Sequence, residues 1–242
     1  MSDTPPLLET QGLTMRFGGV TAVNKVNFRL GEVELRCLIG PNGAGKSTFF
    51  KMLTGQLRPS DGVVRFRGNP ITNSDTHTIA RLGVGIKTQV PSVFDGLSVR
   101  ENVWIAASRV RSPKRAKELT DTLIEQLALT GIVDSVVGRL SHGQRQWVEI
   151  GMVLAGEPEL ILLDEPAAGM TSEEVSRTAE LIRTINRTQA IIVVEHDMQF
   201  IRMIAKRVTV FHQGQILIED TVERVLSNET VRDVYLGKRK TH

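Results

Sequence analysis

Nine residues, GPNGAGKST at Gly40–Thr48, have the composition of a phosphate-binding loop. They match the pattern G-x-x-x-x-G-K-[ST], in which glycines let backbone N–H groups converge on phosphate oxygens. The lysine can reach the outer phosphates of a nucleotide, and the hydroxyl that follows it can ligate magnesium. The alternative is a glycine-rich turn that binds nothing. The residues predicted to bind are Gly40, Pro41, Asn42, Gly43, Ala44, Gly45, Lys46, Ser47 and Thr48, with Ser47 also a metal ligand.

Two adjacent acids end the apolar run LILLDE. We expect Asp164 to hold magnesium through water, and Glu165 to orient or deprotonate an attacking water. Adjacent side chains in a strand point to opposite faces. Because the strand is predicted to end here, both acids could still face one nucleotide. An ordinary carboxylate at a strand end is the alternative interpretation.

A second segment that favours anions is LSHGQRQW, Leu140–Trp147, at the start of a predicted amphipathic helix. A helix N-terminus attracts negative charge. Ser141 and Gln144 also form S-x-x-Q, a capping box that closes a helix without any ligand. The local pattern therefore leaves both interpretations open. The predicted buried stripe of this helix is Trp147, Ile150, Gly151 and Leu154.

The elements that position these residues are predicted from apolar periodicity. Alternation from Leu7 to Leu30 around Gly18-Gly19 predicts antiparallel strands, and ELRCLIG predicts a strand that runs into the phosphate loop. KSTFFKMLTGQL predicts a helix that ends in the region of Pro59 and Gly62. VVRFRG predicts a further strand, and the chain from about Pro91 to Glu157 has helical spacing. Short strands follow in LILLD, AIIVVEH and RVTVFHQGQILIED, the last a hairpin that turns at Gln213-Gly214. Strands that alternate with helices indicate a parallel α/β sheet.

Composition limits the class of protein. The 242 residues are 40% hydrophobic and 24% charged, as in ordinary globular proteins, and the net charge of +3 is too small to argue for nucleic acid. No apolar run approaches the ~20 residues of a membrane span, and MSDTPPLLET does not have the pattern of a secretory signal. The single Cys37 excludes an intramolecular disulfide, fits a reducing compartment, and is expected in the core.

The order of the three motifs, GPNGAGKST, then LSHGQ, then LILLDE, resembles the ATP-binding cassette (ABC) ATPases, whose signature sequence is LSGGQ. The resemblance covers nearly the whole chain. It implies an α/β fold, a RecA-like P-loop NTPase core with an antiparallel β subdomain and an α-helical subdomain. The predicted division is a core of residues 1–88 and 157–226, a helical subdomain of residues 89–156 and a tail of residues 227–242.

Three further residues gain roles from this resemblance. Gln89 in KTQVPSVFD is similar to the glutamine that contacts magnesium and water, and His196 in VVEHD to the switch histidine that contacts the terminal phosphate. Phe17 in MRFGGV is similar to the aromatic residue that stacks on adenine. Taken alone, His196 would be a surface residue and Phe17 a core residue. The resemblance thus implies MgATP as ligand, with Lys46, Gln89, Glu165 and His196 as catalytic residues and Asp164 and Gln89 beside the metal.

In this family two cassettes, identical or different, dimerise head to tail, and each ATP lies between the phosphate loop of one and the signature of the other. The resemblance therefore implies that Ser141, Gly143 and Gln144 bind the partner's nucleotide. Two residues depart from the family pattern. His142 replaces the first glycine of LSGGQ, and Thr171 in EPAAGMT stands where the family usually has aspartate, so we assign Thr171 no catalytic role.

The segments RFGGVTAV, LSHGQRQWVEIGM and EPAAGMT resemble those of importers of branched-chain amino acids and, more closely, of urea. Such importers join two cassettes to two membrane permease subunits and a periplasmic solute receptor. This implies a peripheral position on the cytoplasmic face of the inner membrane in a bacterial-type cell, with no nucleic-acid partner. A surface around Val93 and Phe94 would accept the permease, although an apolar pair could equally be core.

Three alternatives remain. The first is the energy subunit of an exporter, which has the same chemistry. The second is a soluble cassette ATPase that acts on DNA or ribosomes, although the coiled-coil insertion or second cassette of those relatives is not found in this sequence. The third is a nucleotide-binding regulator without hydrolysis, against which Lys46, Asp164, Glu165 and His196 argue.

Overall fold

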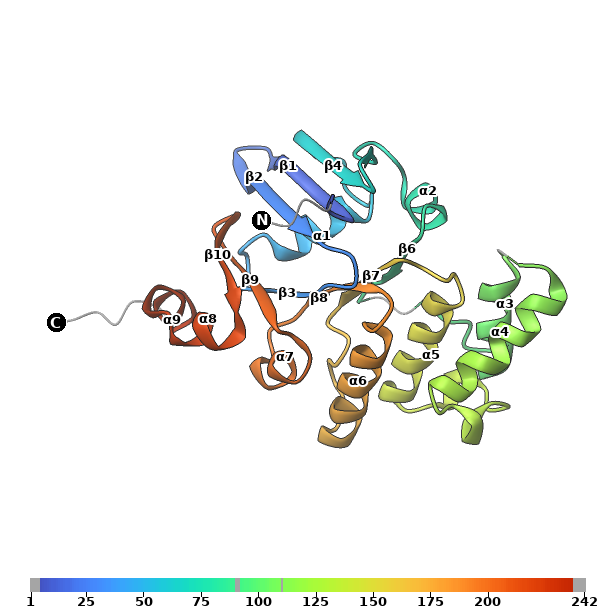
Figure 1. The fold of residues 1–242 in the computed structure, drawn as a ribbon. Coiled ribbons are helices and arrows are strands. Elements are labelled where there is room, and N and C mark those ends of the chain that lie inside the picture. The colour runs from blue at the N-terminus through green and yellow to red at the C-terminus, as the bar shows by residue number, and fades with distance from the viewer. Residues whose placement is uncertain (1–4, 90–91, 110, 237–242) are drawn as a thin grey trace.

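The protein is described by a computed structural model over residues 5–89, 92–109 and 111–236. Within these residues the chain forms two β-sheets and a set of helices (Figure 1). The larger sheet has the described strand order β10-β9-β3-β8-β7-β6. Its strands are β3 (Leu35–Ile39), β6 (Val84–Lys87), β7 (Leu160–Asp164), β8 (Ala190–Val194), β9 (Arg207–His212) and β10 (Gln215–Thr221).

The centre of this sheet is parallel and fully covered. Every residue of β3, β7 and β8 is buried, as is typical of parallel strands with helices on both faces. β3 pairs in parallel with β8 and β9, and β7 with β6 and β8. The predicted parallel α/β sheet is confirmed. The predicted hairpin is confirmed as well, because β9 and β10 are antiparallel on either side of Gln213 and Gly214.

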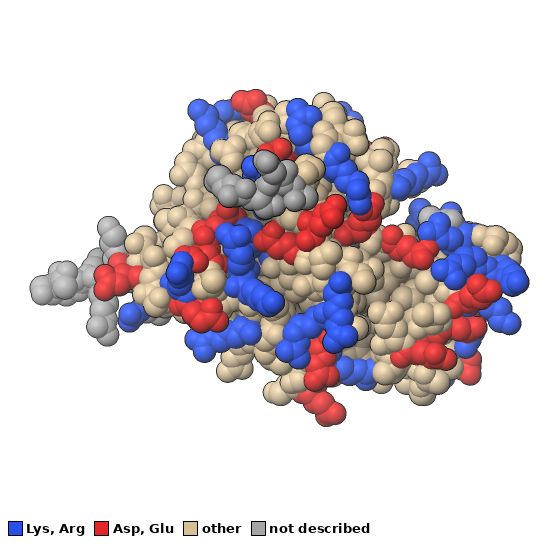
Figure 2. All heavy atoms as spheres, in the orientation of Figure 1, with Lys and Arg blue, Asp and Glu red and all other residues tan. Residues whose placement is uncertain are grey.

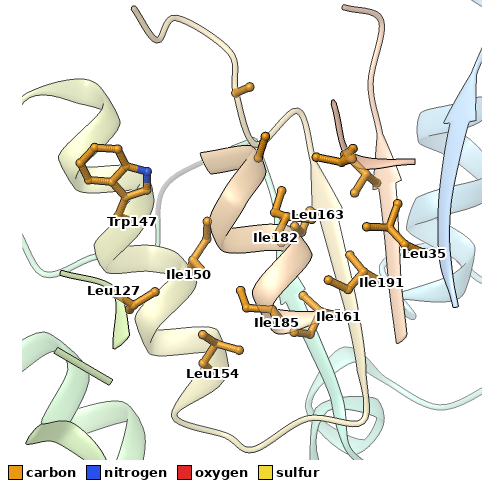
Figure 3. Close-up of a cluster of buried hydrophobic side chains, with 14 of the residues drawn as sticks. Leu35, Leu127, Trp147, Ile150, Leu154, Ile161, Leu163, Ile182, Ile185 and Ile191 are labelled. Carbon is orange, nitrogen blue, oxygen red and sulfur yellow. The ribbon is translucent and has the colours of Figure 1, made fainter. Parts of the chain in front are cut away.

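Two hydrophobic cores lie on opposite faces of the sheet. One joins the sheet to α5 (His142–Leu154), α6 (Ser172–Ile185) and α7 (Met198–Ile204). In Figure 3, Ile150 of α5 and Ile182 of α6 lie in the same cluster as Leu163 of β7. The predicted stripe of α5 is confirmed, because Trp147, Ile150, Gly151 and Leu154 are all buried.

Cys37 of β3 is part of this core, as predicted, and none of its surface is exposed. Burial raises the pKa of its thiol well above the usual range, and the carboxylate of Glu195 adds to the effect. The thiol is therefore a small apolar group of the core and has no reactive thiolate at neutral pH.

The smaller sheet is antiparallel and covers the other face. Its strands are β1 (Leu8–Phe17), β2 (Val20–Leu30), β4 (Asp61–Phe66) and β5 (Asn69–Pro70), in the order β2-β1-β4-β5. Phe49 of α1 (Lys46–Leu53) joins the two sheets. Its ring centroid lies 5.6 Å from that of Phe28 in β2 and 5.2 Å from that of Phe211 in β9. The helix that follows the phosphate loop is thereby packed between the sheets.

The helical region between β6 and β7 contains α3 (Val99–Ser108), α4 (Pro113–Gln126) and α5, which lie together on the right of Figure 1. Two 3-10 turns, Thr130–Ile132 and Val137–Arg139, connect α4 to α5. These helices confirm the helical pattern predicted between about Pro91 and Glu157. The remaining described helices are α2 (Thr76–Arg81), α8 (Val222–Ser227) and α9 (Glu229–Leu236).

One predicted helix is too long. The helix after the phosphate loop was expected to reach the region of Pro59 and Gly62, but α1 ends at Leu53. Gly55 adopts φ +70°, and a Cβ there would lie 2.6 Å from the carbonyl oxygen of Ser74. A left-handed glycine is a common helix terminator. Close packing against the loop before α2 therefore ends the helix early.

Charges of both signs are interspersed over much of the face shown in Figure 2. In the basic segment RVRSPKRAK, just before and within α4, Arg111 pairs with Glu157, and Arg115 lies 3.6 Å from Glu118. These two pairs offset part of the positive charge of the segment. Among the described residues, no helix is both long and apolar enough to cross a bilayer.

Candidate active site

The predicted catalytic residues follow the carboxyl ends of neighbouring parallel strands. Val194 of β8 is paired with Leu38 of β3 on one side and with Asp164 of β7 on the other. Lys87 of β6 is paired with Leu163 of β7. These strands therefore end at one edge of the sheet, which is where open α/β sheets bind ligands. The residues just beyond these ends are Gly40, Gln89, Glu165 and His196.

The phosphate loop needs glycine at defined positions. Gly40, Gly43 and Gly45 have φ of +144°, +78° and +101°, where residues with a Cβ are strained. A Cβ on Gly40 would also collide with the backbone of Phe211, and one on Gly45 would lie 2.5 Å from the carbonyl oxygen of Ala22. The loop is therefore held between β9 and β2. Of the other predicted residues, Asn42 and Ser47 are exposed, Pro41 and Thr48 half-buried and Ala44 buried.

Lys46 begins α1 and folds back over the loop. Its Nζ donates hydrogen bonds to the carbonyl oxygens of Gly40 at 2.6 Å and Pro41 at 3.0 Å. Burial lowers the pKa of this ammonium group, while the carboxylates of Glu165 and Asp164 act in the opposite direction. The loop lysine and the two acids are thus close enough to interact electrostatically, as expected of one site.

Asp164, the last residue of β7, is 6% exposed, and its Oδ1 is buried with no hydrogen-bond partner among the described residues. Burial raises the pKa of this carboxyl to about 6, and the charge of Glu165 adds to the shift. A buried acceptor with no donor is unfavourable in itself. A cation at this position would satisfy it, so the environment of Asp164 is compatible with the predicted metal ligand.

Glu165 adopts a left-handed conformation with φ +47°, which is uncommon for a residue other than glycine. Its N–H donates to the carbonyl oxygen of Val194 at 3.0 Å, so β8 holds this turn. The turn breaks the strand alternation, which explains how adjacent acids can act at one site. The Oε1 of Glu165 lies 3.2 Å from Nδ1 of His196.

His196 is positioned by the acid that precedes it. The backbone N–H groups of His196 and Asp197 donate to Oε2 of Glu195 at 2.8 and 3.2 Å. Glu195 is 2% exposed, and its burial raises the pKa of its carboxyl. The His196 side chain is 64% exposed, so the imidazole itself is accessible at the edge of the sheet.

Phe17 lies at the tip of the β1–β2 hairpin, paired with Val20. The two residues are 47% and 66% exposed, so the alternative that Phe17 is a core residue is wrong. Asn24 of β2 donates its N–H to Gly214, and Gly214 donates its own to Ala44, both with N···O distances of 2.8–3.0 Å. These hydrogen bonds connect β2 to the phosphate loop through Gly214. The hairpin that carries the exposed Phe17 ring is therefore attached to the phosphate loop.

The capping box predicted at the start of α5 is present. Gln144 donates its N–H to Ser141 Oγ at 3.2 Å, and Ser141 donates its N–H to Gln144 Oε1 at 3.0 Å. Ser141 also donates its hydroxyl to Oε1 of Glu174 in α6 at 3.1 Å. Gly143 packs so closely against the same carboxylate that a Cβ would collide with it.

The two departures from the family pattern have structural explanations. Thr171 is the N-cap of α6, in a capping box with Glu174, so it stabilises the helix start. The His142 imidazole lies 3.1 Å from Nε2 of Gln146, one turn later in α5. A Cβ on Gly169 would lie 3.3 Å from the same ring, so His142 fills space beside the segment that follows Glu165.

Comparison with known proteins identifies the family to which this site belongs. The model of the ABC transporter family matches residues 23–168, more than half of the chain. The chain is an ABC ATPase. The high-affinity branched-chain amino acid transport ATP-binding protein BraF of Pseudomonas aeruginosa is 35% identical over 251 residues, or 96% of this chain and 98% of BraF. The lipopolysaccharide export system ATP-binding protein LptB of Haemophilus influenzae is 33% identical over 237 residues, 96% of this chain and 98% of LptB.

The fold agrees with this assignment. The crystal structure of the ADP conformation of an ATP-binding cassette from an ABC transporter superposes with a TM-score of 0.86 at 28% identity, and covers 97% of this chain and 100% of that cassette. The predicted P-loop NTPase fold with ABC architecture is therefore confirmed.

A buried ion pair in the ABC ATPase was not predicted from the sequence. Lys87 Nζ at the end of β6 lies 3.5 Å from Oε2 of Glu149 in α5, and both side chains are almost fully buried. Burial lowers the pKa of Lys87, while Glu149 acts against this. Oε1 of Glu149 accepts the N–H of Ser92 at 2.6 Å. The pair thus connects the strand before the exposed Gln89 to α5, the helix that Ser141 caps.

The predicted permease surface is partly exposed. Phe94 is 50% exposed, whereas Val93 is half-buried and packs against the core that includes residues of α5. Asn102 of α3 holds the Phe94 backbone, because its Oδ1 accepts the Phe94 N–H at 2.7 Å and its Nδ2 donates to the Phe94 carbonyl at 3.1 Å. The ring is therefore presented to solvent from a fixed backbone.

Proposed function

We propose that this ABC ATPase is the energy-supplying subunit of an importer and that it works as a pair of cassettes, identical or different. Each ATP would lie between the phosphate loop of one cassette and the Ser141 helix start of the other. The observation that supports this proposal is the separation of the two segments that we propose to bind anions. Lys46 begins α1, and Glu165 and His196 follow the ends of β7 and β8. Ser141, in contrast, is exposed at the start of another helix, and no hydrogen bond between described residues joins it to the phosphate loop.

Within one site, the side chains divide the work of phosphoryl transfer to water. The glycine loop and the N-terminus of α1 hold the phosphates, and Lys46 offsets their charge. Glu165 accepts a proton as the water oxygen bonds to the γ-phosphorus and the bond to the ADP oxygen breaks. His196, 3.2 Å from Glu165, hydrogen-bonds the γ-phosphate. The exposed ring of Phe17 stacks on adenine.

Magnesium fits the residues present. Asp164 has an unpartnered buried oxygen, and Ser47 has an exposed hydroxyl at the first turn of α1, so both offer the oxygen ligands that this ion prefers. Gln89, exposed just beyond β6, is the third proposed contact. When bound, the ion would neutralise charge on the β- and γ-phosphates.

We propose that the membrane partners are two permease subunits, which contact the surface around Val93 and Phe94, with a periplasmic receptor delivering the solute. This would place the chain on the cytoplasmic face of the inner membrane. The similarity to BraF supports a branched-chain amino acid as solute. The resemblance of the segment GQRQWVEIGM to urea importers supports urea instead. The similarity to LptB favours one alternative, the energy subunit of an exporter.

Replacing the proposed base tests the catalytic part. Glu165→Gln should keep ATP binding, slow hydrolysis severely, and accumulate an ATP-held dimer on size exclusion with light scattering. Ser141→Ala in the same background should weaken that dimer. Full-rate hydrolysis by an isolated monomer, unaffected by Ser141→Ala, would contradict the proposal.

The transport part needs its own experiment. Co-purification of the chain from its native membrane should yield permease subunits, and uptake of labelled urea and leucine by the reconstituted complex identifies the solute. Phe94→Ala should lower permease assembly and coupled hydrolysis but leave the fold intact. Unchanged assembly would rule out the docking surface.

A further inference from the structure

Glu174 is an acid that no proposed catalytic role includes, yet it touches both the signature segment and the segment that follows Glu165. Its Oε1 accepts the hydroxyl proton of Ser141 at 3.1 Å. Its Oε2 accepts the N–H of Thr171 at 3.0 Å and the Thr171 hydroxyl at 3.2 Å. The carboxylate therefore lies between the N-termini of α5 and α6.

This position is fixed by the packing of the two helices. Trp147 Nε1 in α5 donates to Thr178 Oγ1 in α6 at 2.9 Å. The Arg177 guanidinium stacks 3.8 Å above the Trp147 ring and also donates to the carbonyl oxygens of Leu127 and Ala128 at the end of α4. Since α5 and α6 are held together along this side, the Glu174 carboxylate remains beside Ser141.

The contact between Ser141 and Glu174 matters because Ser141 has a limited number of hydrogen bonds to make. A serine hydroxyl has one proton to donate. Here Ser141 Oγ accepts from the N–H of Gln144 and donates its proton to Glu174. A phosphate oxygen is an acceptor, so Ser141 can donate its hydroxyl proton to a phosphate only by giving up its hydrogen bond to Glu174. The N–H of Thr171, together with Ser141 and other donors, holds the pKa of Glu174 below its usual range, so the competing group is an anion at neutral pH.

We propose that Glu174 is a resident anion at the signature helix and that it sets the ATP concentration needed to close the cassette pair, because the γ-phosphate must displace it from Ser141. This inference rests on the proposed function, in which Ser141 binds the partner's nucleotide. Glu174 acts through Ser141 and through its charge, so it is a positioning residue and takes no part in the chemical step.

The test uses Glu174→Gln, which removes the charge but preserves the α6 capping box, since glutamine serves there as well as glutamate. The matched control is Glu173→Gln on the exposed neighbouring residue. In the Glu165→Gln background, Glu174→Gln should lower the ATP concentration for half-maximal dimerisation about three- to tenfold, as expected for relief of repulsion between a carboxylate and a phosphate a few ångströms apart near solvent. Glu173→Gln should change it less than about twofold.

Steady-state kinetics with Glu165 intact give a second readout. Glu174→Gln should lower the KM for ATP and leave kcat unchanged, with the same melting temperature as the wild type. A loss of stability without a change in KM would show that Glu174 only caps α6. An ATP requirement equal to that of Glu173→Gln, or higher than that of the wild type, would overturn the proposal.

Failure of the proposed function has a different signature. If the Glu165→Gln chain forms no ATP-dependent dimer, or if Ser141→Ala leaves that dimer unchanged, then Ser141 does not bind the partner's nucleotide, and the role of Glu174 is refuted with it. If Ser141→Ala weakens the dimer but Glu174→Gln matches its control, the inference alone is wrong.

Discussion

Asp164 should make the protein less stable in the absence of ligand, and Asp164→Asn should reveal by how much. Its carboxyl is almost fully buried, and burial raises its pKa from 3.8 to about 6. A shift of this size corresponds to about 3 kcal/mol of penalty on the charged form, and screening at the open edge of the sheet reduces it to about 1–2 kcal/mol. Asparagine has a similar shape and no charge, so it removes this penalty.

The pH dependence gives the sign. Because the folded pKa exceeds the unfolded one, the folded state binds more protons between pH 4 and pH 6. The wild type therefore gains stability as pH falls through this window, whereas Asp164→Asn lacks this contribution. The advantage of the variant should be largest above pH 6 and should disappear near pH 4. At about 2–4 °C per kcal/mol for a chain of this size, we expect a rise in Tm of roughly 2–8 °C at pH 7.5.

The assay is thermal unfolding with EDTA and no nucleotide, at several pH values between 4.5 and 7.5. Asp134→Asn, at an exposed acid, is the control and should behave like the wild type. A Tm for Asp164→Asn at or below that of the wild type at pH 7.5 would refute the reasoning, as would a difference that does not depend on pH. The same variant should lose most magnesium-dependent ATP hydrolysis.

Three further predictions concern neighbouring features. Glu149→Gln leaves the Lys87 ammonium buried without its carboxylate, so urea unfolding should show a loss of about 3–5 kcal/mol; a loss below about 1 kcal/mol would contradict a buried ion pair. Gly40→Ala should abolish nucleotide binding and destabilise the chain more than Gly43→Ala, because a Cβ at Gly43 has no atom within 4 Å. Equal effects of the two substitutions would contradict the close packing of Gly40 against β9. Phe17→Ala should change Tm by less than about 1 °C, since the ring is exposed, but should weaken ATP binding about fivefold in a titration, whereas unchanged affinity would exclude stacking.

Local chemistry explains which features could be predicted from the sequence. The phosphate loop and the α5 capping box each depend on residues within nine positions of one another, and both are present. Strands β7 and β8 were predicted because burial on both faces leaves an apolar run, and β3 was predicted although Arg36 interrupts its apolar residues. The helix α2 was not predicted. It has an Asp75 cap but only six residues, too few for a helical period to appear.

Contacts between distant segments could not be predicted in this way. Lys87 and Glu149 are buried together only because β6 lies beside α5. Glu174 reaches Ser141 only because α6 also lies beside α5. The left-handed backbone of Glu165 is held by a hydrogen bond to β8, so the sequence LILLDE contains no local signal for it. Each of these depends on the packing of elements that are far apart in the chain.

The burial of Cys37 makes its thiol a natural probe of whether the central sheet is folded. A maleimide cannot reach a protonated sulfur on a central strand, so a cysteine introduced on the surface can carry a spectroscopic label while the natural thiol stays silent. Conversely, any modification of Cys37 counts the molecules in which the sheet itself has opened. Pulsed alkylation of the unaltered chain would therefore measure how strongly nucleotide binding holds the fold together.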